Sequence, residues 1–555
     1  MARRLLLPAL AGCLVLVLAG PALAAGTTYY VNCAAATNGN GSQASPWNNL
    51  GTVDSATFSP GDSLLFARGT TCAGSFVFSS SGTSASRITI GAYGTGALPV
   101  IDGTGQNRAV KLLDTSYVTM QDLEVTNSKV WGVLVTTDHD APAVGLTLQN
   151  LVVHHVTGGD YTAMSAKWTG LVVFAPGMVV EPDMAKGSGV YDRKSYFSNV
   201  LVDNVQAYDT TLWAGIFVWG VQIDQDFQWA RDCVNTAIQS RNITIQNSTV
   251  HDTYGDGITQ YCSQNGTLQN NVVYRSGMQP PPESIGTPVG LWWWSSENML
   301  GQLNESYDNH SPTVDGGGFD IDYGSTNSTM QYNYGHENST YCMSIFGYRG
   351  ATTTSVYRYN ICAGDGTVHT YQKYNSRKNT WTNVTMPGDS EIYVCTWGGG
   401  KLVNTWIYNN TYYVNGTGQS AGLISVCPGG GDAESGAIFR NNLVTSTVSN
   451  IFGDVAVLND RARDYNLYYY TGGTVSDPNP ESHSIYNQNP LVNGFGYDTA
   501  GRPTTQWTLQ SGSPAINHGT NACSGLSGCT VGTRDFFGNA IPLGGAYDIG
   551  ADEAQ

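Results

Sequence analysis

The sequence predicts an all-β fold, a parallel β-helix, on three observations. Helical periodicity is almost absent, and short segments of alternating apolar and polar residues recur along the 555-residue chain. Asparagine stands at the turn after many of these segments. Their spacing falls within the ~20–50 residues typical of solenoids and propellers, whereas propeller and leucine-rich-repeat signatures are missing from the sequence. Stacked coils of short strands therefore account for the pattern best.

The asparagine repeat sets the expected register of the central coils. Its members include LQNNVVYR (268–275), MQYNYGHE (330–337) and FRNNLVTS (439–446). Aligning the later members gives steps of 33, 29 and 27 residues between Asn271, Asn304, Asn333 and Asn360. Stacked asparagine side chains can hydrogen-bond from coil to coil while tolerating the left-handed backbone of a tight turn. Each coil then buries its inward side chains against its neighbours, giving one long core.

The first 25 residues have the pattern of a secretory signal peptide. Arg3 and Arg4 precede an apolar run that ends in Ala22-Leu23-Ala24, with small residues at 22 and 24. A membrane anchor is the alternative, but the run is shorter than the ~20 apolar residues of a span. Lipidation at Cys13 is a second alternative, disfavoured because the apolar run continues past it. We therefore expect a secreted, extracellular protein without membrane contact after cleavage.

Ten cysteines follow Cys13, and an even number in an exported chain predicts disulfides. Pairing sequence neighbours gives five bridges, although the sequence does not fix the connectivity. No CxxC motif or Cys/His group has zinc spacing, so no metal site is predicted.

The charge balance excludes several partners. Lysine and arginine total 25 against 42 aspartate and glutamate residues, which gives a formal net charge of −17. Phosphate binding requires clustered cations, so nucleic acid and anionic membranes are excluded. A 41% hydrophobic content supplies a large core, and one large β domain accounts for the length. We expect a monomer.

Three regions resemble a known superfamily. Residues 27–105, with SPGDSLLFARGTTCAG at 59–74, look like the N-terminal cap of secreted bacterial right-handed parallel β-helix proteins that act on polysaccharides. The closing LQSGSPAINHG (509–519) and RDFFGNAIPLGGAYDIGADE (534–553) are similar to the last coils of that superfamily. DGGGFDIDYGSTNSTMQYNYGHEN (315–338) resembles a coil pair in its glycoside hydrolase branch, which includes β-helix fucosidase and xylanase relatives. The superfamily also holds lyases and epimerases.

The resemblance implies a right-handed, single-stranded solenoid with an N-terminal cap and C-terminal closing coils. We expect the cap and first coils over 26–110, and the C-terminal coils and cap over 461–555. The central β-helix would occupy 111–460, with loop insertions at 160–200, 222–235 and 366–401. Long loops on a rigid scaffold commonly carry binding function.

Strand alternation sorts the side chains of one sheet into inner and outer faces. Segments that begin at glycine, such as GITQY (257–261), GLWWW (290–294) and GFDID (318–322), carry mostly apolar residues at the first and third positions after it. The second and fourth positions then face outward, and we expect an exposed column of aromatic rings that ends at two carboxylates. The expected sugar platforms are Trp219, Tyr261, Trp292 and Trp294. The alternative is a loop that covers the column.

Asp320 and Asp322 are the predicted catalytic pair. Residues i and i+2 share one strand face, with backbones ~6.6–7 Å apart. Glycoside hydrolysis needs two carboxyls, ~5–5.5 Å apart in retaining and ~6.5–9.5 Å apart in inverting enzymes. Like charges this close also drive their proton affinities apart. The alternative is a pair that bonds to backbone or holds calcium.

Other candidates are weaker. Asp256 stands between glycines at a strand entrance and is a third candidate catalytic residue, or a turn residue. His336 and Glu337 are candidate substrate-binding residues, although a histidine in a turn can also be merely solvated. Asp315, Glu297 and Glu337 are acidic residues near the same coils whose facing the pattern leaves open. Lys373 lies in a basic cluster of the 366–401 insertion that could steer an anionic sugar, unless this is an ordinary solvated loop.

The leading functional hypothesis is a secreted glycoside hydrolase acting on a polysaccharide or oligosaccharide, with no cofactor required. The alternatives are a calcium-assisted lyase of a uronate-containing glycan, with Lys373 or Arg349 as base, and a non-catalytic carbohydrate-binding solenoid.

Overall fold

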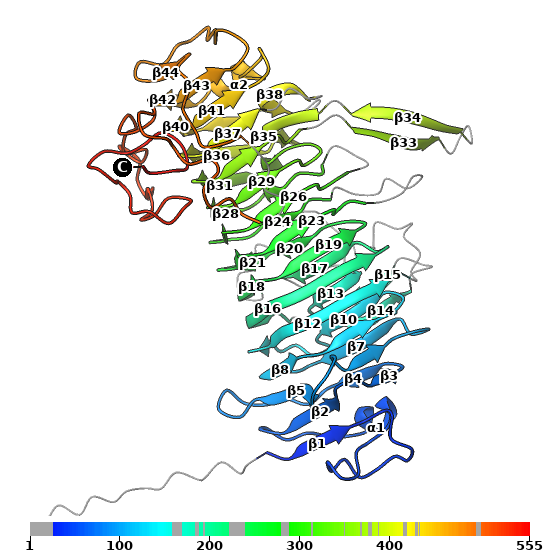
Figure 1. The fold of residues 1–555 in the computed structure, drawn as a ribbon. Coiled ribbons are helices and arrows are strands. Elements are labelled where there is room, and N and C mark those ends of the chain that lie inside the picture. The colour runs from blue at the N-terminus through cyan, green and yellow to red at the C-terminus, as the bar shows by residue number, and fades with distance from the viewer. Residues whose placement is uncertain are drawn as a thin grey trace, which may run out of the picture.

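The computed structural model describes residues 26–157, 169–183, 188–191, 195–220, 239–278, 288–311, 315–348, 350–366, 369–375, 380–386, 388–414, 419–427, 431, 433–495 and 501–554. The chain is a right-handed parallel β-helix, as predicted. Its coils stack into a long column that runs from the N-terminal to the C-terminal region (Figure 1).

One face of the column is an 11-stranded sheet in which every neighbouring pair is parallel. Its strands are β4 (Phe76–Phe78), β7 (Arg108–Leu113), β10 (Trp131–Thr136), β13 (Gly170–Ala175), β17 (Ala214–Trp219), β20 (Ile258–Tyr261), β24 (Leu291–Trp294), β27 (Phe319–Ile321), β30 (Met343–Tyr348), β35 (Gly388–Trp397) and β38 (Gln419–Val426). We call it the long sheet.

The remaining coil strands form a 29-stranded sheet that bends into two rows. The first row holds β1 (Thr28–Val31), β2 (Ser63–Ala67), β5 (Ile88–Tyr93), β8 (Val118–Gln121), β11 (Ala143–Val144), β18 (Ser240–Gln246), β21 (Ser263–Gln264), β22 (Thr267–Gln269), β25 (Leu300–Gln302), β28 (Thr326–Gln331), β31 (Ala351–Arg358), β36 (Lys401–Tyr408), β39 (Glu434–Ser435), β40 (Ile438–Arg440) and β42 (Ala462–Asp464).

The second row holds β3 (Thr71–Ala73), β6 (Val100–Asp102), β9 (Glu124–Thr126), β19 (Thr249–Thr253), β23 (Val272–Tyr274), β26 (Glu305–Tyr307), β29 (Tyr334–His336), β32 (Ile361–Ala363), β37 (Thr411–Val414), β41 (Leu443–Ser446), β43 (Leu467–Tyr470) and β44 (Ile485–Tyr486). The long strands β12 (Thr147–Val156) and β16 (Phe197–Thr210) run through both rows. Asn150 and Asn204, with φ of 52° and 53°, stand within these strands at the bend between the rows.

The predicted asparagine register is confirmed by a buried ladder of hydrogen bonds. The side-chain amide of Asn271 donates to Oδ1 of Asn304 at 3.1 Å, and the same bond recurs from Asn304 to Asn333 at 3.0 Å and from Asn333 to Asn360 at 3.0 Å. The ladder continues through Asn410, Asn442 and Asn466. It satisfies amide groups that would be costly to bury alone.

The two roles expected of one asparagine are divided between neighbouring residues. In the first coil of the ladder Asn270 has φ of 53°, whereas the next residue, Asn271, forms the ladder bonds. The same division recurs at Tyr332 and Asn333, where a tyrosine adopts the positive φ of 58°. The turn therefore accepts residues other than asparagine, but the ladder position is asparagine throughout its described length.

Short helices and a side segment complete the molecule. Helix α1 (Leu50–Asp54) packs on β4 near one end, and α2 (Val455–Asn459) packs on β38 near the other. Residues 501–554 lie along the side of the upper coils, where Tyr408 donates a hydrogen bond to the carbonyl of Thr530 at 2.6 Å (Figure 1). The hairpins β14 (Met178–Asp183) with β15 (Ser188–Tyr191) and β33 (His369–Asn375) with β34 (Thr380–Met386) stand outside the coils, and the latter projects from the column.

Disulfides are present, as predicted, and the described ones join sequence neighbours, which the sequence alone did not fix. The described bridges are Cys33–Cys72, Cys342–Cys362, Cys395–Cys427 and Cys523–Cys529. Cys262 is also disulfide-bonded, and its sequence neighbour Cys233 lies outside the described residues, as does the predicted signal peptide. Within the described part of the chain, no helix combines the length and apolarity needed to cross a membrane.

Candidate active site

Strand register places the predicted carboxylates and aromatic residues in shared rows of the long sheet. Trp292 pairs with Thr259 on one side and with Asp320 on the other, and Asp320 pairs in turn with Ser344. The neighbouring row faces inward, because Gln260 donates a hydrogen bond to the carbonyl of Ile243 in the core. The row that carries Trp292 and Asp320 therefore points away from the core.

The aromatic column is nevertheless covered, so the prediction that it is exposed is wrong. Trp219, Tyr261, Trp292 and Trp294 are only 1–5% exposed. Their rings contact one another: the centroid of Tyr261 lies 5.0 Å from that of Trp292, 4.9 Å from that of Trp294 and 5.1 Å from that of Trp219. Outward-facing side chains here form a second apolar layer outside the sheet rather than an open platform.

Asp320 is buried in this layer. It is 1% exposed, and its Oδ1 atom has no hydrogen-bond partner among the described residues. Burial, followed by the charge of Asp322, raises the pKa of Asp320 well above its usual range, while a hydrogen bond with Ser344 opposes the shift. Asp315 and Asp256 raise this pKa further. This environment favours the protonated form of the carboxyl.

Asp322 and Asp315 retain more access to solvent, at 7% and 6% exposure. Oδ1 of Asp322 accepts the backbone N–H of Tyr323 at 2.6 Å, and Oδ1 of Asp315 accepts the hydroxyl of Tyr341 at 3.3 Å. The three glycines at 316–318, between Asp315 and Asp322, leave room for the ring of Tyr341. A Cβ on Gly317 would lie 1.9 Å from the ring of Tyr341, so only glycine fits beside it.

Asp256 is anchored by both of its carboxylate oxygens. The indole of Trp213 donates to Oδ2 at 2.5 Å, and the backbone N–H of Val289 donates to Oδ1 at 3.2 Å. The side chain is fully buried. This geometry favours the alternative that Asp256 is a structural turn residue. Its charge also raises the pKa of Asp320.

The structure does not bring His336 and Glu337 to this cluster. His336 lies on β29 in the other sheet, fully buried, with its ring stacked on Tyr307 at 4.7 Å. Burial opposes its protonation, but hydrogen bonds with Glu305 and Glu337 outweigh that effect and raise the pKa of His336. His336 is thus tied to carboxylates of its own sheet rather than to a site beside Asp320.

Two predicted elements of the site lie wholly or partly outside the described residues. Lys373 lies on β33, in the hairpin that projects from the column, and its side chain lies outside the described residues (Figure 1). The insertion at 222–235 also lies outside them.

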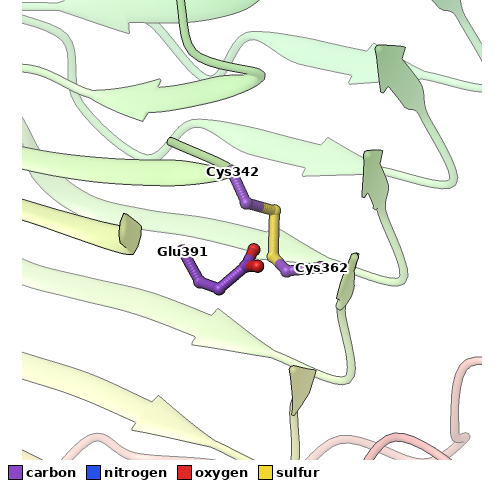
Figure 2. A group of neighbouring side chains, drawn as sticks. All are labelled: Cys342, Cys362 and Glu391. Atoms are coloured by element: carbon purple, nitrogen blue, oxygen red, sulfur yellow. A yellow bond between two sulfur atoms is a disulfide. The ribbon is translucent and has the colours of Figure 1, made fainter. Parts of the chain in front are cut away.

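Asp365 and Glu391 form a second buried carboxyl pair. Burial raises the pKa of Asp365 to about 6, and burial together with Asp365 raises that of Glu391 well above its usual range. The side-chain amide of Asn338 donates to Oδ1 of Asp365 at 2.6 Å. Figure 2 shows Glu391 beside the Cys342–Cys362 bridge.

Two groups of described residues bring potential cation ligands within 4.8 Å of one another. One is Cys342, Cys362 and Glu391, but its sulfurs form a disulfide and so lack the thiolates that bind metals. The other is Asp114, Asp138 and His139, and His139 already contacts both carboxylates at 2.8 and 3.0 Å. Neither group includes a carboxylate of the Asp320 cluster.

Sequence reasoning missed the aromatic wall beside the cluster. Tyr323 lies 5.1 Å from Trp294 and 5.7 Å from Trp397 between ring centroids. Trp397 comes from β35, two strands beyond Asp320, and no local pattern in the sequence joins the two.

Comparisons with known proteins show the fold. No family model matches the chain, and no curated protein sequence matches it. Among solved structures, the GH136 lacto-N-biosidase from Eubacterium ramulus aligns with a TM-score of 0.55 and 21% identity over 74% of this chain. This chain covers 66% of the length of that protein. Pectate lyase Pel9A aligns with a TM-score of 0.44 and 14% identity over 96% of this chain and 98% of its own. XylC, solved with xylose, aligns with a TM-score of 0.47 and 10% identity, covering 84% of this chain and 87% of its own.

Proposed function

We propose that this protein is a secreted carbohydrate-active enzyme, specifically a glycoside hydrolase that uses the Asp320 cluster. The proposal rests on the different environments of Asp320 and Asp322. These two carboxyls are two residues apart in the chain and share one strand face. Glycoside hydrolysis needs one carboxyl that holds a proton for the leaving oxygen and one that is ionised. Burial and the charge of Asp322 raise the pKa of Asp320 and so favour its protonated form, which suits it to the acid role.

Asp322 takes the second role in this scheme. It would attack the anomeric carbon directly or deprotonate the attacking water, depending on the final distance between the carboxyls. Its backbone hydrogen bond from Tyr323 is one that a carboxylate accepts, and it is more accessible than Asp320. Asp315 has similar access and is the alternative partner, so both aspartates are tested below.

The charges around the cluster favour a hydrolase over a lyase. A lyase must neutralise the carboxylate of a uronate before removing the neighbouring proton, which needs a cation. Among the described residues, the charged groups that raise the pKa of Asp320 most are Asp322, Asp315 and Asp256, all of them acidic. The fold supports only the broader proposal of a carbohydrate-active enzyme. The protein of similar fold named above is described as a lacto-N-biosidase.

A screen of the secreted protein against neutral and uronate polysaccharides tests the proposal. A hydrolase releases reducing ends without new ultraviolet absorbance, whereas a lyase product absorbs through its new double bond. Release of unsaturated products that stops with a chelator would favour the lyase. Retention in a polysaccharide gel without any release would favour a binding solenoid.

A further inference from the structure

Trp397 is the exposed end of a path of aromatic rings that begins at the carboxylates. Tyr323 follows Asp322 directly in the chain, and its ring meets that of Trp397 at 5.7 Å in an edge-to-face contact. The ring of Tyr348 stacks on Trp397 at 5.2 Å with an interplanar angle of 28°. Trp397 is 37% exposed, unlike the buried rings of the column.

The backbone around Trp397 is held from two sides. Trp397 ends β35 as the register partner of Tyr348 at the end of β30. The N–H of Gly400 donates to the carbonyl of Trp397 at 2.9 Å and closes a tight turn. A Cβ on Gly400 would lie 2.2 Å from the backbone of Gly347, so the turn can pack there only with glycine. The indole is therefore presented by a fixed frame.

An exposed indole in a fixed frame suits the apolar face of a pyranose ring. The ring C–H groups of a sugar cover the π face, while its hydroxyls remain in water. The carboxylate of Asp322, which directly precedes Tyr323, and the net charge of −17 disfavour a uronate relative to a neutral sugar. A neutral sugar meets no such cost.

We propose that Trp397, supported by Tyr348, forms a subsite for a neutral pyranose ring of a glycan that extends to Asp322. The inference rests on the proposed function for the identity of the bound chain as substrate. Binding at Trp397 itself does not require catalysis.

The test measures binding without turnover, in an Asp320→Asn background. Calorimetric titration uses xylohexaose, cellohexaose, galactotetraose and N-acetyllactosamine as neutral probes and tetragalacturonate as the acidic probe. At least one neutral probe should bind more tightly than tetragalacturonate. Adding Trp397→Ala should weaken that binding about tenfold. Trp397→Phe should reduce the affinity much less, because an aromatic ring remains.

Phe495→Ala is the matched control, because Phe495 is 38% exposed and stacks on Tyr413 in a different part of the molecule. It should leave binding unchanged. Binding that survives Trp397→Ala, equal loss in the control, preference for tetragalacturonate, or no binding of any neutral probe would each overturn the subsite. Neutral binding that depends on Trp397 in a wild-type protein that cleaves no glycan would leave the subsite standing and remove the hydrolase.

Discussion

Asp320 on β27 stands directly opposite Trp292 on β24, and both side chains point away from the core yet are buried. A carboxylate in this position loses its hydration, and the described charged groups that act on it most are themselves carboxyls. The free energy of ionising Asp320 is therefore raised both by the aromatic layer that buries it and by the charge of Asp322. This relationship joins the fold to the proposed chemistry.

Asp320→Asn should lower kcat by orders of magnitude, because amide nitrogen cannot donate a proton to the leaving oxygen. Stability should not fall at neutral pH. The folded pKa is raised, so ionisation costs the wild type stability as pH rises from the unfolded value through the folded value. The melting temperature should therefore depend less on pH in the variant than in the wild type. Equal dependence on pH would show that the pKa of Asp320 is the same in the folded and unfolded states.

Asp322→Asn and Asp315→Asn separate the two possible partners of Asp320. We expect the first to abolish turnover and the second to retain part of it. Asp315 raises the pKa of Asp320, so removing its charge should move the basic limb of the pH–rate profile to lower pH. If Asp315→Asn abolishes turnover and Asp322→Asn retains part of it, Asp315 rather than Asp322 is the second catalytic carboxyl.

Asp256→Asn should act mainly on stability. The amide nitrogen would face either the indole N–H of Trp213 or the backbone N–H of Val289, so one buried donor loses its acceptor. The expected cost is about 1–3 kcal/mol in denaturant unfolding. Loss of turnover at full stability would instead assign Asp256 to the chemistry.

Asn333→Ala tests the buried ladder. It removes the oxygen that accepts both the backbone N–H and the side-chain amide of Asn304 in the core, and should cost at least about 1–3 kcal/mol. Gln302→Ala is the control, since Gln302 bonds to Gln269 on a partly exposed face of the neighbouring coil and should cost less. Equal losses would mean that the ladder adds nothing beyond an ordinary surface bond.

Glu391→Gln should change how stability responds to pH. Both Asp365 and Glu391 have raised pKa values, so the wild type should lose stability as pH rises through about 6 and beyond. The variant lacks one ionisation and should melt at a higher temperature than the wild type at pH 8, with little difference at pH 4. A constant difference at both pH values would place the effect in packing instead.

The register of the fold could be predicted because its signal is local and repeated. Asn271, Asn304 and Asn333 each stand at one point of a coil, so alignment of short segments found their partners. Strand parity likewise placed Asp320 beside Trp292. Both inferences need only the period of a strand and the length of a coil.

The cover over the aromatic column could not be predicted in the same way. Parity tells which side of a sheet a residue faces, but not what lies beyond that side. The place of Trp397 near Tyr323 depends on pairing between β30 and β35, which are separated in sequence by a hairpin. Asp315 was also uncertain, because three glycines interrupt the alternation before Asp320.

Infrared difference spectroscopy at pH 7 between the wild type and Asp320→Asn tests the protonation of Asp320 most directly. The account predicts that the wild type shows the carbonyl stretch of one additional protonated carboxylic acid, which the variant lacks. A difference spectrum that contains only the bands of an ionised carboxylate would contradict it and leave the cluster without its acid.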